Sequence, residues 1–220
     1  MNKINYNINE KWNYENGFYH TSDINRIGKL LSQFDIYNKI INKPGDILEF
    51  GVYKGCSIIR LLSFRHFLEN SFSRKIYGFD TFDKFPKNVK SSIDYDFINK
   101  FENEGGDPIC INELNTVLKR KNFNNYTLIK GDIFNTLPLF LKKNPHLRIS
   151  LLHIDVDVYE PTMFILELLW EKIIKGGILM LDDYGTVSGE TNAIDDFFFN
   201  KKDYLINTTS FNQTPCYIIK

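Results

Sequence analysis

The chain has 220 residues, enough for a single large α/β domain with its own core, and 27 acidic side chains balance 27 basic ones. A formal net charge of zero gives no basic excess, which argues against a nucleic-acid partner. Three cysteines without C-x-x-C spacing indicate neither a disulfide framework nor a zinc cluster, and no apolar run approaches about 18 residues. We therefore expect one cytoplasmic domain over residues 1–220, with no membrane partner.

The N-terminal part of the chain predicts a helix, a strand and a second helix. Apolar residues at helical spacing extend over residues 22–42, and a proline-glycine pair ends this first helix. The apolar run 46–50 predicts the first strand. A tight turn over residues 51–55 then leads into a second helix, in which apolar residues recur as far as Phe67.

The turn after the first strand carries the first candidate binding residues. Its pattern is E-x-G-x-x-x-G, and the glycines let the backbone turn sharply and let a ligand approach the main chain. The pattern differs from the G-x-G-x-x-G fingerprint of nicotinamide cofactors, and it suits a ligand with a carboxylate, an amine and a ribose, such as S-adenosylmethionine. Taken alone, the turn is equally compatible with a plain strand–helix connection. The candidate cofactor-binding residues in this segment are Glu49, Gly51, Tyr53, Gly55 and Ser57.

Acidic residues also follow the second and third predicted strands. The run 75–79 ends at Asp80, whose carboxylate can accept hydrogen bonds from both ribose hydroxyls, with Thr81 beside it. The run 126–130 is followed by Asp132, which can accept a hydrogen bond from the adenine amino group. Because ligands of open α/β sheets bind at the carboxyl ends of the strands, these positions favour the cofactor interpretation of the turn.

Between these two strands, residues 87–115 are polar and only weakly periodic. A segment of this length inside a compact domain is often a lid or a substrate-binding insertion. A solvated surface excursion is an equally good interpretation, and the sequence alone leaves both open.

The rest of the chain continues to alternate strands with helices. The expected elements are a strand at 149–154, a helix at 161–174, a strand at 178–181, a helix at 192–200 and strands at 204–207 and 216–219. The total is seven strands, which predicts an α/β fold with parallel pairing and right-handed crossovers.

The fourth and fifth predicted strands end abruptly in carboxylates. Asp155 and Asp157 lie two residues apart, so along a continuing strand their side chains would share one face, roughly 6–7 Å apart. Asp182 and Asp183 follow the neighbouring strand. Four carboxylates this close would repel one another without a cation, and hard oxygen ligands favour Mg²⁺. We assign Asp155, Asp182 and Asp183 to the metal, and Asp157 to a general base that takes a proton from a substrate hydroxyl. Asp155 is also a candidate cofactor-binding residue.

A purely structural interpretation exists for each of these residues. Asp157 or Asp183 could end a strand and cap the segment that follows, although two such pairs at adjacent strand ends are hard to explain in this way. His153 lies between two apolar residues, and we expect it to be a hydrogen-bonded core histidine rather than a catalytic one.

Four segments of the chain resemble the macrocin O-methyltransferase family, and they are residues 49–55, 78–82, 153–160 and 176–185. Residues 189–197 also fit the family, although Pro161 and the segment 87–115 depart from it. The resemblance implies a Rossmann-like seven-stranded class I methyltransferase sheet with helices on both faces and an antiparallel last strand. It also implies S-adenosylmethionine and Mg²⁺ as cofactors, metal binding at Asp155, Asp182 and Asp183, and Asp157 as the general base.

The resulting hypothesis is a Mg²⁺-dependent O-methyltransferase that acts on a hydroxyl of a sugar or related polyol. The acceptor would be a small molecule or a glycan, either from a polysaccharide or from a secondary metabolite, and a homo-oligomer is compatible with the sequence. One alternative is a nucleotide-cofactor oxidoreductase of the NAD type, against which the missing G-x-G-x-x-G counts. Another is a non-catalytic binding module, against which the complete set of four aspartates counts.

Overall fold

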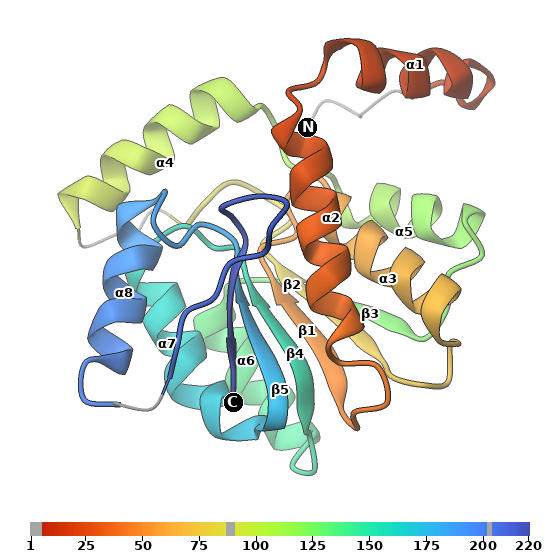
Figure 1. Ribbon diagram of the computed structural model, residues 1–220. Coiled ribbons are helices and arrows are strands. Elements are labelled where there is room, and N and C mark those ends of the chain that lie inside the picture. Colours follow the sequence, from red (N-terminus) through yellow and green to blue (C-terminus); the bar gives the residue numbers. More distant parts are fainter. Residues whose placement is uncertain (1–5, 87–90, 202–203) are drawn as a thin grey trace.

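The computed structural model describes residues 6–86, 91–201 and 204–220, and its centre is a six-stranded sheet (Figure 1). The strands are β1 (Asp46–Phe50), β2 (Ile76–Asp80), β3 (Tyr126–Lys130), β4 (Ile149–Ile154), β5 (Ile173–Leu181) and β6 (Cys216–Ile219). They lie in the order β3-β2-β1-β4-β5-β6, and only β6 runs antiparallel to its neighbour. The order reverses between β1 and β4, so their carboxyl ends flank the crevice in which such sheets bind ligands.

Helices cover both faces of the sheet, as predicted. One face packs against α2 (Asn25–Asn38), α3 (Cys56–Leu68) and α5 (Ile111–Arg120), and the other against α6 (Ile133–Lys143), α7 (Tyr159–Leu169) and α8 (Ser188–Phe198). Successive residues of a strand point to opposite faces, so Ile47 joins one core cluster and Leu48 the other. None of the helices in the described ranges has the length and hydrophobicity that crossing a lipid bilayer requires.

The central strands are the most deeply buried ones. All six residues of β4 are buried, whereas the edge strand β3 is only half-buried. Helices on both faces leave a central parallel strand no solvated side, so its sequence is a continuous apolar run rather than an alternating one. This burial explains why the sequence predicted β1 and β4 with the correct boundaries.

The prediction of a seventh strand at 204–207 was wrong for the described residues. Residues 202 and 203 lie outside them, and Asn207 makes only one isolated antiparallel bridge, with Tyr217. The ring of Tyr204 packs against Trp170 instead, and Leu205 is exposed. The apolar residues of this segment therefore pack on helices or face solvent, and do not extend the sheet.

The weakly periodic segment 87–115 is largely helical where it is described, with residues 87–90 outside the description. It forms α4 (Ser92–Gly105) and the start of α5. The buried side chain of Asp94 accepts a hydrogen bond of 3.0 Å from the backbone N–H of Tyr159, at the first residue of α7. This contact holds α4 against the main body, and a lid role for the segment stays a prediction.

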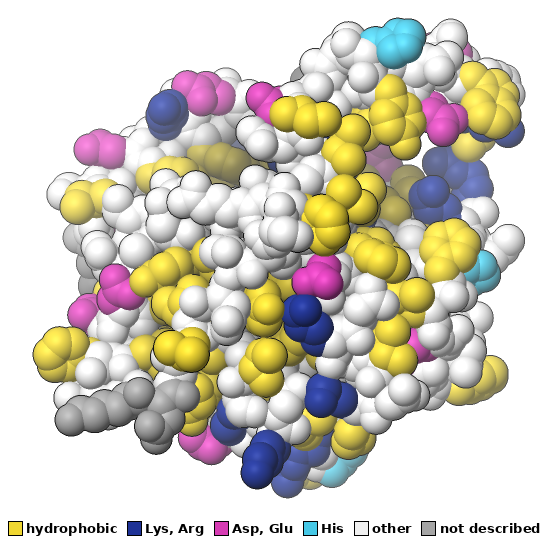
Figure 2. Space-filling model, in the orientation of Figure 1, with side chains coloured by type: hydrophobic (Ala, Val, Ile, Leu, Met, Phe, Trp, Pro, Cys, Tyr) yellow, Lys and Arg dark blue, Asp and Glu magenta, His cyan; other side chains and the backbone are white. Residues whose placement is uncertain are grey.

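An N-terminal helix that the sequence did not predict precedes α2. It consists of a short 3₁₀ turn (Ile8–Glu10) and α1 (Lys11–Thr21), which extends away from the sheet (Figure 1). None of the residues of α1 is buried, and Trp12 and Tyr19 are exposed. Figure 2 shows hydrophobic side chains on the surface of this projecting part. Because α1 buries no apolar stripe, it carries no clear helical pattern in the sequence.

Candidate active site

A pocket of about 420 Å³ opens at the carboxyl ends of the parallel strands. Most of the predicted cofactor-binding residues line it, and these are Gly51, Tyr53, Ser57, Asp80, Thr81, Asp132 and Asp155. Two that were also predicted, Glu49 and Gly55, do not line the pocket. The predicted general base and metal ligands, Asp157, Asp182 and Asp183, line it as well, so a single cavity contains both candidate subsites.

The turn after β1 depends on the glycine at its first position. Gly51 has φ +87°, and a Cβ atom there would lie 1.6 Å from the backbone oxygen of Asp155. Only glycine tolerates both the left-handed conformation and this close approach. The backbone N–H of Asp155 also donates to the carbonyl of Phe50 at 2.8 Å. The turn is therefore packed directly against the backbone that carries the acidic cluster.

Glu49 lies beneath this turn and is completely buried. Its Oε1 atom accepts a hydrogen bond from the hydroxyl of Ser57, at the start of α3, and lies 3.6 Å from Nδ1 of His153. Its Oε2 atom has no hydrogen-bond partner among the described residues. Glu49 thus supports the pocket wall through Ser57.

Asp80 and Asp132 both bind backbone amides. Oδ2 of Asp80 accepts from the N–H groups of Val52 and Tyr53 at 2.7 and 2.8 Å, so this carboxylate fixes the turn after β1. Asp132 caps α6 and accepts from the N–H of Phe134 at 2.9 Å. Both side chains still border the pocket, and their predicted contacts with ribose and adenine stay predictions.

Tyr53 connects the turn to the helical insertion. Its hydroxyl donates to the carbonyl of Gly105 and, at 3.1 Å, to that of Gly106, where α4 ends. Its ring lies 5.1 Å from that of Phe101 on the same helix. The position of α4 and the conformation of the turn are therefore linked through one side chain.

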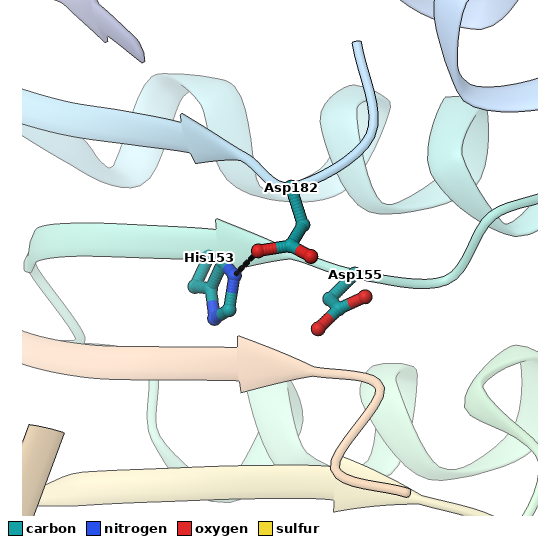
Figure 3. A group of neighbouring side chains, drawn as sticks. All are labelled: His153, Asp155 and Asp182. Atoms are coloured by element: carbon teal, nitrogen blue, oxygen red, sulfur yellow. Dashed lines mark hydrogen bonds and ion pairs between the residues drawn. The ribbon is translucent and has the colours of Figure 1, made fainter. Parts of the chain in front are cut away.

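The four predicted aspartates converge at the ends of β4 and β5. Asp155, Asp157 and Asp183 each have a carboxylate oxygen within 4.8 Å of those of the other two. One ring nitrogen of His153 and one carboxylate oxygen each of Asp155 and Asp182 also lie within 4.8 Å of one another. Figure 3 shows the second group, with the carboxylates of Asp155 and Asp182 close together. The sequence prediction placed Asp155 and Asp157 on one face of a continuing strand, and this was wrong. Strand β4 ends at residue 154, and Asp157 has a left-handed backbone conformation with φ +63°. Aspartate is one of the few residues that tolerate this left-handed conformation.

The electrostatics of the cluster reflect its burial. Burial and the neighbouring carboxylates hold the pKa of Asp155 and of Asp157 well above the usual range. Burial and the charge of Asp182 raise the pKa of Asp183 to about 6. Burial acts in the same direction at Asp182, but His153 and Lys29 outweigh it and lower its pKa to about 2.

Lys29 provides the positive charge at the centre of the cluster. It extends from α2 and forms an ion pair with Oδ2 of Asp182, and the charges of Asp155 and Asp183 also favour its charged form. Four converging carboxylates with a single ammonium group paired to one of them form an arrangement that can bind a further cation. The oxygen donors are of the kind that Mg²⁺ prefers, so the residues fit that ion.

His153 is a buried, hydrogen-bonded histidine, as the sequence predicted. Its Nε2 atom lies 3.3 Å from Oδ1 of Asp182 (Figure 3). Its Nδ1 atom lies 3.6 Å from Oε1 of Glu49. Burial lowers its pKa, but the two carboxylates outweigh that effect and raise the pKa to about 9. The two carboxylates therefore favour the charged form of the ring.

The sequence reasoning missed two residues of the site, Lys29 and Glu190. Glu190 is completely buried at the start of α8, and its Oε1 atom accepts from the backbone N–H of Asp183 at 3.1 Å. Burial and the charge of Asp183 raise its pKa well above the usual range. Glu190 lies in the segment 189–197 that resembles the family, so this resemblance could have identified it as a candidate site residue. Lys29 had no such signal, because only tertiary packing brings α2 to the cluster.

Comparison with known proteins identifies relatives of the chain. A profile of the family described as macrocin-O-methyltransferase (TylF) matches residues 27–209. Demethyldecarbamoylnovobiocin O-methyltransferase of Streptomyces niveus is 27% identical over 71% of this chain and 59% of its own length. Mycinamicin III 3''-O-methyltransferase of Micromonospora griseorubida is 30% identical over 64% of this chain and 56% of its own length. The chain thus spans somewhat more than half the length of these curated relatives.

Solved structures show the same architecture. The calicheamicin methyltransferase CalS11 aligns with a TM-score of 0.76 and 22% identity, covering 99% of this chain and 95% of that one. The O-methyltransferase NovP aligns with a TM-score of 0.74 and 20% identity, covering 88% and 80%. These likenesses establish the Rossmann-like fold, and the profile match covers most of the chain. The chain belongs to the macrocin O-methyltransferase family.

Proposed function

We propose that this chain is a Mg²⁺-dependent O-methyltransferase that transfers the methyl group of S-adenosylmethionine to a sugar hydroxyl, within one domain over residues 1–220. The observation that carries the proposal is the convergence of four carboxylates around an ammonium group at the ends of β4 and β5. Family membership supports the reaction class, and the pocket that joins this cluster to the glycine turn supports a bound nucleoside cofactor.

The residues divide into two groups by the chemistry that they can perform. Asp155, Asp182 and Asp183 would hold Mg²⁺, and the residues around the glycine turn, with Asp80 and Asp132, would hold the cofactor. When bound, S-adenosylmethionine supplies an activated methyl group and Mg²⁺ supplies positive charge that lowers the pKa of a nearby hydroxyl.

Asp157 would accept the proton of the acceptor hydroxyl as the reaction proceeds. Transfer of the methyl group from sulfur to the hydroxyl oxygen would give a methyl ether and S-adenosylhomocysteine, and the proton of the hydroxyl would remain on Asp157. Because the methyl donor is already activated, much of the rate enhancement would come from holding oxygen, carbon and sulfur in line. The buried cluster and the tightly packed turn provide the rigid frame for that alignment.

A sugar is the acceptor class that the relatives favour. One is named as a 4'-O-methyltransferase of a rhamnosyl-tetracenomycin in Streptomyces olivaceus, with 27% identity over 70% of this chain and 58% of its own length. CalS11 is described in a second structure, 26% identical to this chain, as a TDP-rhamnose 3'-O-methyltransferase. We extend the shared feature, a sugar hydroxyl, to this chain as part of the proposal.

The first test is calorimetric titration with S-adenosylhomocysteine, with NAD⁺ as the control ligand. Micromolar binding of S-adenosylhomocysteine alone is expected, and methyl transfer to sugar acceptors should then require Mg²⁺. A preference for NAD⁺ would contradict the proposal and favour the oxidoreductase alternative. Binding of S-adenosylhomocysteine with metal-independent turnover would leave the methyltransferase in place and remove the metal from it.

A further inference from the structure

His153 lies between two carboxylates that belong to different parts of the site. On β4 it pairs in register with Glu49 of β1, and its side chain reaches Asp182, the residue that follows β5. The ring is completely buried, and both of its neighbours can accept hydrogen bonds but cannot donate them when ionised. A single side chain therefore spans three adjacent strands at the floor of the pocket.

Each of the two carboxylates has one oxygen that faces the imidazole, and its second oxygen does not contact the ring. At Asp182, Oδ1 faces Nε2 of His153 at 3.3 Å, and Oδ2 faces Lys29 in the acidic cluster. At Glu49, Oε1 binds Ser57 and faces His153, and Oε2 has no partner among the described residues. The oxygens that face the imidazole are Oδ1 of Asp182 and Oε1 of Glu49, the latter through an ion-pair contact of 3.6 Å rather than a hydrogen bond. The ring therefore helps to orient both carboxylates, together with Lys29 at Asp182 and Ser57 at Glu49.

We propose that His153 is a positioning residue that aligns Asp182 for the metal and, through Glu49 and Ser57, aligns the glycine turn for the cofactor. In this role the imidazole acts through the two carboxylates, because its Nε2 atom already faces Oδ1 of Asp182. The inference rests on the proposed function, because it needs both a metal and S-adenosylmethionine to bind. A partner of a metal ligand typically affects metal affinity by about 10–100-fold, so the effect is measurable.

Two amide substitutions can separate the two contacts of the ring. In His153→Asn, the amide nitrogen can replace Nδ1 and keep the contact with Glu49, but it cannot reach Asp182. In His153→Gln, the nitrogen can replace Nε2 and keep the contact with Asp182. His66→Gln on α3 is the matched control, because His66 is an exposed histidine outside the site.

Mn²⁺ affinity, measured by paramagnetic resonance, and S-adenosylhomocysteine affinity, measured by calorimetry, are the two readouts, with thermal melting as the check on folding. We expect His153→Asn to weaken Mn²⁺ binding by about 10–100-fold and to leave S-adenosylhomocysteine binding nearly unchanged. His153→Gln should do the reverse, with cofactor affinity reduced by about 10-fold.

Three outcomes are distinguishable. Opposite losses in the two variants support the positioning role of His153. Parallel losses of both affinities together with a lower melting temperature, or no change in either affinity, overturn it and leave His153 as a core residue. If the unsubstituted protein binds neither Mn²⁺ nor S-adenosylhomocysteine, the proposed function itself fails.

Discussion

The carboxylates in the two halves of the pocket differ in their partners and in how easily they ionise. On the side of β2 and β3, Asp80 and Asp132 accept hydrogen bonds from backbone N–H groups, so fixed dipoles of the fold stabilise their charges. On the side of β4 and β5, Asp155, Asp157 and Asp183 face one another, and their pKa values rise because burial and repulsion oppose ionisation.

The difference shows what each half can do. Backbone amides hold a carboxylate in place and complete a turn, so the first half has a fixed shape that suits a cofactor. Carboxylates that repel one another are stabilised by a cation, and Lys29 is a cation that the chain itself supplies there. We therefore expect substitutions in the second half to change chemistry and metal binding, and substitutions in the first half to change stability and cofactor binding.

The largest effect is expected for Asp157→Asn, in the second half. Removing a positioned base typically costs about 10²–10⁴-fold in rate, and the amide keeps the size of the side chain. Turnover should fall by that factor, while calorimetry should give an unchanged affinity for S-adenosylhomocysteine. Normal turnover in this variant would show that Asp157 is not the base.

Asp182→Asn should mainly affect metal binding. The loss of one charged ligand should exceed the effect of a supporting residue, so Mn²⁺ affinity is expected to fall by more than about 100-fold. Asp132→Asn is the matched control in the first half and should bind Mn²⁺ as the unsubstituted protein does. Equal losses in both variants would contradict the division of the pocket into two halves.

Asp80→Asn tests the first half. An amide keeps only one acceptor oxygen, so either the two N–H groups of the turn or the N–H of Phe82 lose their partner. This loss should lower the free energy of unfolding by about 2 kcal/mol. For a chain of this size the melting temperature should then fall by roughly 4–8 °C. Mn²⁺ affinity should not change. A loss of Mn²⁺ affinity without a lower melting temperature would contradict the role of Asp80 in fixing the turn.

The smallest effect is expected for Lys29→Met, and its direction is the informative part. Lys29 neutralises the carboxylates that would hold Mg²⁺, so its ammonium group competes with the metal. Replacing it with an uncharged chain should tighten Mg²⁺ binding by about 10-fold, which corresponds to about 1.4 kcal/mol. Calorimetric titration measures this, and weaker binding would mean that Lys29 assists the metal instead.

The sequence predicted those parts of the molecule that local patterns determine. Buried parallel strands are continuous apolar runs, so β1 and β4 and the carboxylates that follow β4 and β5 were found at the correct positions. The segment 204–207 has the same apolar character, but Tyr204 packs on Trp170 and the segment does not join the sheet as a strand. Which of the two arrangements forms depends on the tertiary structure.

The parts that were missed depend on distant contacts. Lys29 reaches Asp182 across 153 residues of sequence, and no pattern in α2 indicates that contact. The left-handed conformation of Asp157 is likewise not indicated by a turn signal, because neither glycine nor proline stands next to it and valines flank it on both sides. Local sequence thus predicted which carboxylates matter, and only the fold revealed how their charges are balanced.

A crystal structure with S-adenosylhomocysteine and Mn²⁺ would show whether the cluster after β4 and β5 is a metal site joined to a cofactor pocket. We expect an anomalous peak within about 2.0–2.3 Å of oxygens from Asp155, Asp182 and Asp183, with Lys29 displaced from Asp182. A structure with S-adenosylhomocysteine bound, no anomalous peak in the cluster and Lys29 still paired with Asp182 would contradict this expectation.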